Sequence, residues 1–594
     1  MESIRSLFAT KVPTSVGEIS LRLSEVVTLA RLKDGEAGPD EALAFYSQIS
    51  QRTSMFPMEW ERLVLKANLL SNPDRLDLLR RLATVELALA DDPDFDHALQ
   101  FEQRWLELQA VDLLSYPVRD GGATHRRWAI ELAVSVLLSP CFLQRDCATM
   151  QQTIQQLHNT FMSSPGEDLN VIAEAGLQVF RQLFSRAELE LSQACSWYDC
   201  LHALFFASVS DVRELCRFDR IAVPLFEAWL SSRYALRPPR AWASSGSVSV
   251  AYLLHVAHSE RGNAVSPLIA SLAEAHSRLG PSRVFLYTVQ HVNDDFRQAM
   301  ISKGVVVRDF SMANYYNRLD ELEHSLAHDG IDVIISEQNR AIASYLFARR
   351  NATCQIWLDT GFPFWRLKSL DWTLSPVLHE QLQQQQRISR IRWGQGRDTL
   401  IQAVDPSQIR RLRLGFPPSC FLIGVIARLV KLDRDYLSFL ERLLRTDPSL
   451  HLLIAGPGDP SLVETFMATS GLAERMTLIR GMVDLNIYGC LIDVLCDTFP
   501  FIGGNACREV AVHGTPVVSR LGTPWDSVLL ADRSPDLLAS TDDEYIRLVR
   551  RLASDPDFLQ QQRDLALAKS VEYEDVAASV EDVELAIRTC LSMR

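Results

Sequence analysis

The feature that most constrains this sequence is a change of pattern near residue 247. Beyond it, short apolar runs rich in Val, Ile and Leu alternate with helical patterns. Such alternation favours parallel α/β sheets, because a crossover helix returns the chain to the same end of the sheet. The runs form two series of similar length, at 248–256, 283–289, 305–307, 333–335 and 355–358, and at 421–427, 451–455, 476–479, 494–497 and 516–519.

The two series predict two Rossmann-like domains facing a cleft, at residues 248–405 and 406–572, with a C-terminal helix at 573–594. Ligands of such sheets bind outside the carboxyl ends of the strands, so we expect the chemistry at those ends. The first domain would hold the acceptor and the second the donor of a transfer reaction.

Residues 1–236 predict an all-helical, all-α N-terminal domain. Apolar residues recur at spacings of three and four, as at Ile130, Val134 and Leu137, which is typical of amphipathic helices. The polar segment 237–247, with its Pro, Gly and Ser residues, is expected to be a linker.

Charge and cysteine content narrow the function classes. The chain carries a formal net charge of -14, so we expect neither nucleic acid nor an anionic membrane as a partner. Its 11 cysteines show no Cys-x-x-Cys pair or zinc-ligand spacing, and we expect free, buried thiols in a reducing compartment. With no evident signal peptide or membrane-spanning run, we expect a cytoplasmic protein without stable membrane insertion.

Two cations follow the first strand of the second series. Arg428 and Lys431 lie three residues apart just after the apolar run 421–427. A Lys point charge and an Arg fork at a strand's carboxyl end are suited to a diphosphate. Such cations stabilise a departing diphosphate without a metal ion. The alternative is a solvated helix start with surface cations.

A glycine turn lies between the fourth strand of this series and the next helix. Gly503 and Gly504 would let the backbone approach a ligand closely, and a helix is expected to begin near Asn505, where its free N–H groups would attract an anion. Glu509, one turn later, could accept hydrogen bonds from ribose hydroxyls. The alternative for Glu509 is a helix-stabilising surface carboxylate.

The first domain offers weaker candidates. His258 lies in a polar loop after the first strand, where a neutral imidazole could take a proton from an acceptor; a solvent-exposed loop histidine is the equal alternative. His255 continues the strand and is expected to be structural. Asp359 and Gly361 follow another strand on the same side, where they line an acceptor site or simply terminate the strand.

Segments 429–433, 488–498 and 503–518 resemble glycosyltransferase family 41, which contains O-GlcNAc transferase and the cytoplasmic bacterial N-glycosyltransferases of adhesins. The resemblance covers about residues 248–570. It places Lys431 at the diphosphate-binding lysine, Arg428 at another polar ligand, Asn505 at a phosphate-binding position and Glu509 at the ribose ligand. The first-domain loop 355–361 is also similar, and His258 lies in the region of the family's cleft histidines.

The departures from this family favour its bacterial branch. The loop at Gly503 lacks the paired threonines of the eukaryotic members, and the N-terminal half lacks clear tetratricopeptide repeats. The bacterial members carry an all-helical N-terminal domain, and the resemblance then implies that this domain recognises or orients an acceptor polypeptide.

The resemblance implies an inverting, metal-independent GT-B glycosyltransferase that moves a hexose, glucose first, from a UDP-sugar to a protein side chain. The favoured acceptor is Asn in Asn-x-Ser/Thr, with Ser or Thr next, on a partner such as an adhesin or another surface protein. No metal or other cofactor is expected. The implied site residues are, for catalysis, His258 and Lys431; for the donor, Arg428, Lys431, Gly503, Gly504, Asn505 and Glu509; and on the acceptor side, His255, Asp359 and Gly361.

Two other functions remain open from the sequence. The same donor chemistry could act on a lipid or a saccharide, or the chain could be a non-catalytic helical scaffold with a degenerate α/β part. The absence of a Walker-type Gly-Lys-Ser/Thr loop argues against a nucleoside triphosphatase.

Overall fold

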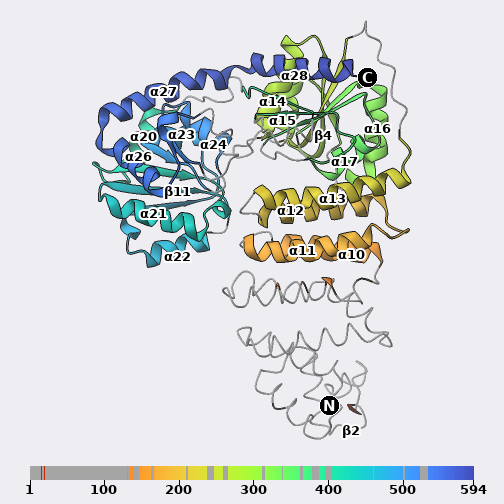
Figure 1. Cartoon of the computed structure of the whole chain (residues 1–594), viewed down its shortest axis with the longest axis horizontal. Coiled ribbons are helices and arrows are strands. Elements are labelled where there is room, and N and C mark those ends of the chain that lie inside the picture. Colours follow the sequence, from red (N-terminus) through yellow and green to blue (C-terminus); the bar gives the residue numbers. More distant parts are fainter. Residues whose placement is uncertain are drawn as a thin grey trace, which may run out of the picture. The chain divides into compact units, whose positions relative to one another are not determined.

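The computed structural model describes most of the chain beyond residue 145 (Figure 1). The described ranges are 146–161, 166–208, 212–236, 247–257, 265–310, 315–337, 339–360, 365–376, 387–394, 404–458, 460–499, 502–521 and 533–593, with a few residues before them. The chain divides into two compact units, residues 1–193 and 194–594.

The first unit is helical in most of its described residues. Helices α10 (Cys147–Phe161) and α11 (Gly166–Leu183) pack against each other, burying residues such as Ile154 and Phe180. One detail corrects the all-helical prediction. Strands β1 (Ser15–Val16) and β2 (Ile19–Ser20) form a short antiparallel pair, which a search for helical periodicity does not register because each strand has only two residues.

Helices α12 (Leu191–Ser208) and α13 (Val212–Arg233) lie almost wholly in the second unit, together with the α/β domains. The boundary between the units therefore falls inside the region predicted as one helical domain. Two buried carboxylates of α13 fasten it to the loop before β8: Asp219 accepts the N–H of Arg366 at 2.7 Å, and Glu227 accepts that of Lys368 at 2.9 Å. The predicted linker at 237–247 lies outside the described residues except for its last residue.

The first α/β domain is a seven-stranded, wholly parallel sheet in the order β5-β4-β3-β6-β7-β8-β9. Its strands are β3 (Ser249–Ala257), β4 (Arg283–Val292), β5 (Val306–Asp309), β6 (Val333–Ser336), β7 (Cys354–Leu358), β8 (Trp372–Ser375) and β9 (Ile388–Arg390). The helices between them are α14 (Val265–Leu279), α15 (Asp294–Ser302), α16 (Leu319–His328) and α17 (Ala341–Ala348). The strand order reverses between the neighbouring strands β3 and β6. In doubly wound sheets, ligands typically bind at the carboxyl ends of the two strands at this point.

The second α/β domain repeats this topology. Its parallel sheet has the order β12-β11-β10-β13-β14-β15, and the corresponding reversal lies between β10 and β13. The strands are β10 (Phe421–Ile426), β11 (Leu450–Gly456), β12 (Met476–Arg480), β13 (Val494–Cys496), β14 (Val517–Arg520) and β15 (Leu538–Ala539). The helices are α20 (Pro406–Arg413), α21 (Arg434–Thr446), α22 (Ser461–Thr469), α23 (Leu485–Leu491), α24 (Asn505–Ala511) and α26 (Asp542–Ser554).

The predicted strands are confirmed in both domains, because near-continuous apolar runs mark strands that are covered on both faces. The sequence missed β8, β9 and β15. These are short strands of four, three and two residues, and a short run offers too few positions for a pattern to stand out.

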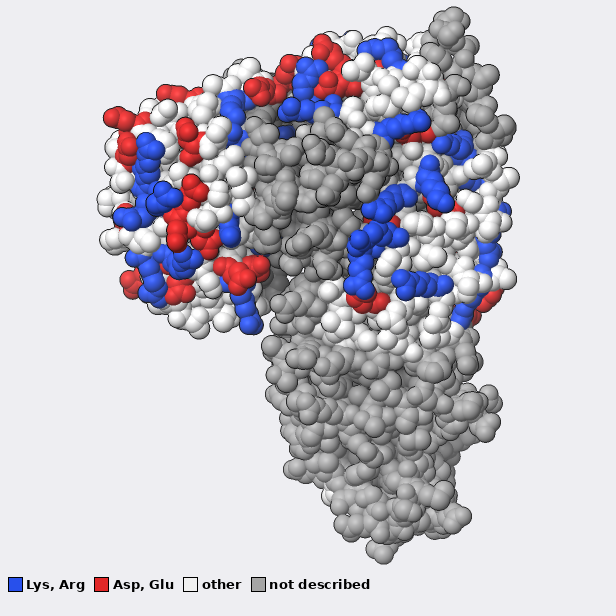
Figure 2. Space-filling view, in the orientation of Figure 1, with Lys and Arg blue, Asp and Glu red and all other residues white. Residues whose placement is uncertain are grey.

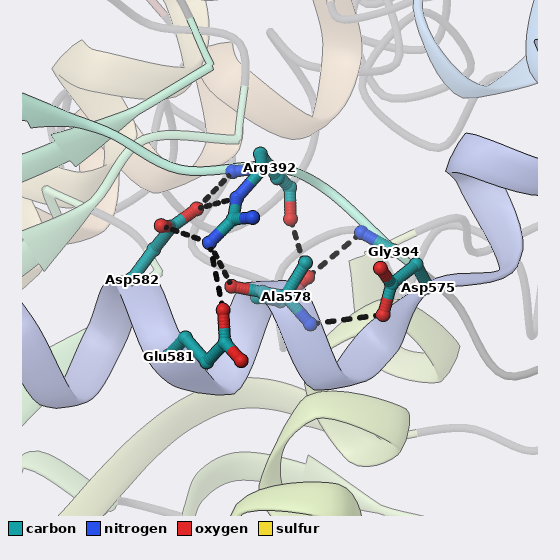
Figure 3. Close-up of polar contacts among 7 residues, drawn as sticks. Arg392, Gly394, Asp575, Ala578, Glu581 and Asp582 are labelled. Carbon is teal, nitrogen blue, oxygen red and sulfur yellow. Dashed lines mark hydrogen bonds and ion pairs between the residues drawn. The ribbon is translucent and has the colours of Figure 1, made fainter.

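The C-terminal segment consists of two helices with a break at Asp575. Helix α27 (Pro556–Glu574) packs on the second domain, against α24 and α26, whereas α28 (Val576–Ser592) packs on α14 of the first domain (Figure 1). Figure 3 shows how a loop after β9 holds α28: Arg392 donates to Asp582 from its Nε and Nη2 atoms at 2.9 and 2.7 Å. The amide of Gly394 donates to Ser579 Oγ at 2.8 Å.

A disulfide corrects the expectation that all cysteines are free. Cys354 on β7 forms a disulfide with Cys590 on α28, and both residues are buried. Seven other cysteines with described side chains are free: Cys147, Cys195, Cys200, Cys420, Cys490, Cys496 and Cys507. The pairing could not be read from the sequence because 236 positions separate the two residues.

The described surface is mixed in charge. On the face in Figure 2, acidic and basic side chains are interspersed rather than gathered by sign. Among the described helices, none has the length and apolarity needed to cross a bilayer.

Candidate functional site

The strongest candidate site lies at the reversal point of the second sheet. Two chain segments meet there: residues 427–433, which follow β10, and residues 497–499 and 502–505, which follow β13. The carboxyl ends of neighbouring parallel strands share one edge, so groups placed after these two strands can act on one ligand.

Lys431 joins the two segments directly. It ends a single 3₁₀ turn, Leu429–Lys431, and its Nζ donates to the carbonyl oxygen of Ile502 at 3.1 Å. Burial lowers the pKa of Lys431, the carboxylate of Asp497 raises it in part, and the positive charge of Arg428 lowers it again. A cation partly removed from water attracts an anion more strongly than an exposed one.

Arg428 lies at the end of the same strand with an exposed side chain. Its effect on the pKa of Lys431 shows that the two cations share one neighbourhood. The helix expected directly after them begins slightly later, at Arg434, with Asp433 as its cap; Asp433 accepts the N–H of Tyr436 at 2.8 Å. The predicted cation pair is thus at a strand end, on a 3₁₀ turn rather than on the helix.

Asp497 organises the loop opposite Lys431. Its side chain is buried and accepts the N–H of Gly503 at 2.5 Å and the hydroxyl of Ser519 at 2.9 Å. Burial raises the pKa of Asp497, and the nearby charge of Arg533 lowers it in part. The carboxylate therefore folds the loop back so that residues 502–505 lie beside the ammonium group.

Only one of the two predicted glycines is required by the fold. A Cβ at Gly503 would lie 2.7 Å from Cys507 Sγ and 2.8 Å from Asp497 Oδ1, which is closer than such atoms approach. A Cβ at Gly504 would meet nothing within 4 Å, and its φ is -99°. The packing of the loop therefore excludes a side chain at Gly503, whereas Gly504 is an exposed position that tolerates one. The close approach of the two glycines to a ligand stays a prediction.

Helix α24 begins at Asn505, as predicted, and carries Glu509 one turn further on. The side chain of Glu509 is half-buried, and burial raises its pKa from 4.5 to about 7. A surface carboxylate would not show this shift, so the half-buried position counts against the alternative of a simple surface residue.

Sequence reasoning missed three residues that shape this loop. Asp497 accepts the N–H of Gly503, Arg533 donates to the carbonyl of Gly503 at 3.0 Å, and Tyr545 donates to the carbonyl of Asp497 at 3.1 Å. Arg533 and Tyr545 follow the loop by 30 and 48 residues. The only signal available for Asp497 was an acidic residue directly after an apolar strand.

The acceptor-side predictions are only partly within the described residues. His255 lies on β3, which confirms that it continues the strand, and its side chain is 2% exposed. Asp359 is also buried; it accepts the hydroxyl of Ser375 at 2.7 Å and its N–H donates to Leu374, contacts that support strand termination. His258 and Gly361 lie outside the described residues.

One group in the described part of the chain has donors close enough for a metal ion. Oxygen of Asp371 and the sulfurs of Cys354 and Cys590 lie within 4.8 Å of one another. The sulfurs are bonded to each other, and Asp371 already accepts from Arg350 at 2.6 Å and from the N–H of Gln355 at 2.9 Å. The donors are therefore committed to holding the strand and helix together.

Comparison with solved structures shows similarity to glycosyltransferases. A mutant O-GlcNAc transferase of Thermobaculum terrenum has 18% sequence identity and a TM-score of 0.54, with 96% of this chain and 98% of that chain covered. HepE of Anabaena, solved in complex with UDP and glucose, has 14% identity and a TM-score of 0.45 over 58% of this chain and all of the other. WaaG, a glycosyltransferase involved in lipopolysaccharide biosynthesis, has 13% identity and a TM-score of 0.40 over 56% and 98%.

No protein-family model matches the sequence, and no curated protein sequence matches it. The likeness to the Thermobaculum enzyme extends over nearly all of both chains, and at this level of identity it shows the fold. Together with the two repeated parallel sheets, it confirms the predicted α/β class: the chain has the GT-B fold, with helices preceding its two Rossmann-like domains.

Proposed function

We propose that this protein is a metal-independent glycosyltransferase that transfers a hexose from a UDP-sugar to a protein side chain with inversion. The observation that carries the proposal is the contact between Lys431 Nζ and the carbonyl of Ile502. It brings a partly buried cation against a tight glycine loop at the ligand-binding edge of a Rossmann-like sheet.

The roles of the donor-side residues follow from this geometry. Lys431 and Arg428 stabilise the negative charge that develops on the diphosphate as the sugar leaves, in the way that fixed charges stabilise a transition state. Gly503 lets the loop backbone come close, and Asn505 lies at the start of α24 beside it. Glu509, when ionised, accepts hydrogen bonds from the ribose hydroxyls.

A polypeptide acceptor is favoured by the way the helices are attached to the first domain. Helix α13 is bound to the first domain through buried carboxylates rather than through exposed contacts. A helical element that is integral to the acceptor-side domain supports recognition of an extended partner. Asn in Asn-x-Ser/Thr remains the favoured side chain, with Ser or Thr next.

The donor is tested first by calorimetry of UDP binding in the presence of a chelator. We expect binding without a divalent ion and its loss in Lys431→Ala. Next, UDP-glucose labelled in the sugar is incubated with peptides that contain Asn-x-Thr, with matched peptides in which Gln replaces Asn, and with saccharide and lipid extracts.

The label identifies the acceptor class. Label in the Asn peptide but not in its Gln control supports the proposal, and label only in saccharide or lipid assigns the same donor chemistry to another acceptor. A protein that binds no UDP and releases none from any donor would be a scaffold, and the proposal would be withdrawn.

A further inference from the structure

His255 occupies the reversal point of the first sheet, between β3 and β6. The ladder between these strands ends at the pair Leu253 and Ser336, and the register between β3 and β4 shifts between Leu254 and Val256. His255 therefore lies beyond the end of the ladder with β6 and at the register shift of the ladder with β4, which resumes at Val256. Irregularities of this kind are frequent beside active sites, where they redirect a side chain.

One carboxylate holds both the backbone and the ring of His255. Glu337, the residue after β6, accepts the N–H of His255 at 2.8 Å through Oε1, and its Oε2 lies 3.2 Å from Nδ1 of the imidazole. Both side chains are buried. With the Nδ1 proton directed to the carboxylate, the lone pair of a neutral ring is on Nε2. Within the described residues, Nε2 is buried and has no hydrogen-bond partner.

A second histidine–carboxylate pair in the same domain shows what a structural pair looks like. His276 on α14 contacts Tyr252 through Nδ1 at 2.8 Å and Glu584 through Nε2 at 2.7 Å, so both ring nitrogens are satisfied. Glu584 also accepts from Ser282, directly before β4, at the opposite end of the sheet from the strand ends that bind ligands. A buried nitrogen without a partner is costly, and it distinguishes His255, which lies at the ligand-binding edge of the sheet, from His276.

Helix α12 fixes the segment that carries Glu337. Asn339 is held by His202, with 2.8 Å between Nε2 and Oδ1, and by the hydroxyl of Tyr198, which donates to its carbonyl at 3.2 Å. Asp199 accepts the N–H of Ala341 at 2.9 Å. A helix from outside the sheet thus immobilises the β6–α17 connection, and a rigid second layer of contacts is what orients a reacting group.

We propose that His255, oriented by Glu337, is the group that accepts the proton from the acceptor side chain. This inference rests on the proposed function. In the reaction, the acceptor's O or N atom forms a bond to the anomeric carbon while the bond from that carbon to the diphosphate oxygen breaks. The electron pair of that bond leaves with UDP, and the acceptor's proton passes to Nε2.

Glu337 stabilises the imidazolium ion that forms, and the proton then returns to water. His255 is 2% exposed without substrates, so acceptor binding has to open a path to Nε2. Hydrogen bonds of this type commonly form only in the substrate complex.

The test compares His255→Gln and Glu337→Gln with His276→Gln as the matched control. Removing a general base lowers the rate of transfer by about 100-fold or more. We expect that loss in kcat for His255→Gln and a smaller one for Glu337→Gln, with UDP affinity unchanged because UDP binds to the other domain. His276→Gln should lower the Tm and leave the kcat of the folded protein within about twofold.

A structural role is separated from a chemical one by rescue. Adding imidazole to His255→Gly should restore transfer in proportion to its concentration, because the free base occupies the vacated space and accepts the proton. Imidazole should not rescue His276→Gly or Lys431→Ala.

Four results bear on the inference. Full kcat in a folded His255→Gln protein overturns it, as does a loss that imidazole does not restore in His255→Gly. If His255→Gln does not fold, Glu337→Gln decides, since it keeps a group that can accept the backbone N–H. A wild-type protein that binds UDP but transfers no sugar would instead remove the proposed function, and this inference with it.

Discussion

The two α/β domains share one structural feature at the same position in the sheet. In each, a buried carboxylate directly after the fourth strand accepts a backbone N–H: Glu337 that of His255, and Asp497 that of Gly503. The residue that the first strand or the turn after it supplies differs: His255 lies on the last part of β3, and Lys431 lies on the 3₁₀ turn after β10. In both domains the carboxylate fixes the local backbone by accepting an N–H group. The functional side chain, His255 or Lys431, determines the chemistry.

This difference teaches how a repeated fold can place different chemistry at the same position in its two sheets. A lysine beside a glycine loop is suited to a departing diphosphate, whereas a neutral imidazole with a lone pair is suited to a proton. The fold supplies the position at the sheet edge, and function depends on the side chains placed there.

The largest expected effect tests the donor half of the comparison. Lys431→Ala should reduce the rate of transfer by about 100-fold, because it removes a charge that stabilises the leaving diphosphate. Steady-state kinetics with labelled UDP-glucose measure the change. Lys303→Ala, an exposed lysine of the first domain paired with Glu274, serves as the control and should stay within about twofold. Comparable losses in both variants would contradict the assignment.

The glycine loop can be tested with two neighbouring substitutions. Gly503→Ala should weaken UDP binding by about tenfold, since its Cβ would collide with Cys507 and Asp497 and push the loop away from Lys431. Gly504→Ala should change UDP affinity by less than about twofold, because its Cβ meets nothing. Calorimetry measures both, and equal effects would show that the loop's shape does not depend on the Asp497 contact.

The raised pKa of Glu509 predicts a dependence on pH that only the second domain should show. Its pKa of about 7 means that the carboxylate is mostly protonated at about pH 6 and mostly ionised at about pH 8. If the ionised form holds the ribose, UDP binding should strengthen by up to about tenfold over that range. Glu509→Gln controls for ionisation of UDP itself, and an identical pH profile in this variant would remove the ribose role.

The same shift has a consequence for stability. The native protein holds the Glu509 proton up to a higher pH than the unfolded chain, whose Glu titrates near 4.5. The stabilisation is therefore fully present below about pH 4.5 and is lost as the pH rises through about 7. Urea denaturation across this range should show a steeper decline for the wild type than for Glu509→Gln.

The smallest expected effect concerns the contacts that hold the C-terminal helix α28 on the first domain. Asp582→Asn should lower the free energy of unfolding by about 1 kcal/mol, because Asp582 is mostly buried beneath the Arg392 fork. Glu581→Gln, whose side chain is 73% exposed beside the same arginine, should change it by less than about 0.5 kcal/mol. Equal effects in urea denaturation would show that α28 is not held by this clamp.

Much of the donor side could be predicted because its signals are local. Lys431, Gly503 and Glu509 lie within a few residues of strand ends, where apolar runs, turn glycines and helix starts are visible in short windows. The approach of Gly503 and Gly504 to a ligand stays a prediction, and only the fold shows that a Cβ would collide at Gly503 and not at Gly504.

The acceptor side was less accessible to sequence reasoning. Its important contact, between His255 and Glu337, joins residues 82 positions apart, and His255 alone was expected to be structural. Nothing near His255 or His276 in the sequence shows which of the two histidines leaves a ring nitrogen without a partner. The distinction depends on whether the second ring nitrogen has a partner, which is a property of packing.

The sequence by itself determined the alternation of strands and helices, the two-domain organisation beyond residue 247 and the placement of donor-side groups at strand ends. These depend on periodicity and turn residues, which act over a few positions. The tertiary structure decided the partners: Glu337 for His255, Asp497 for the glycine loop and Cys590 for Cys354. Most of these pairings join residues far apart in the sequence, and burial and sheet order, which are set by the whole domain, bring them together.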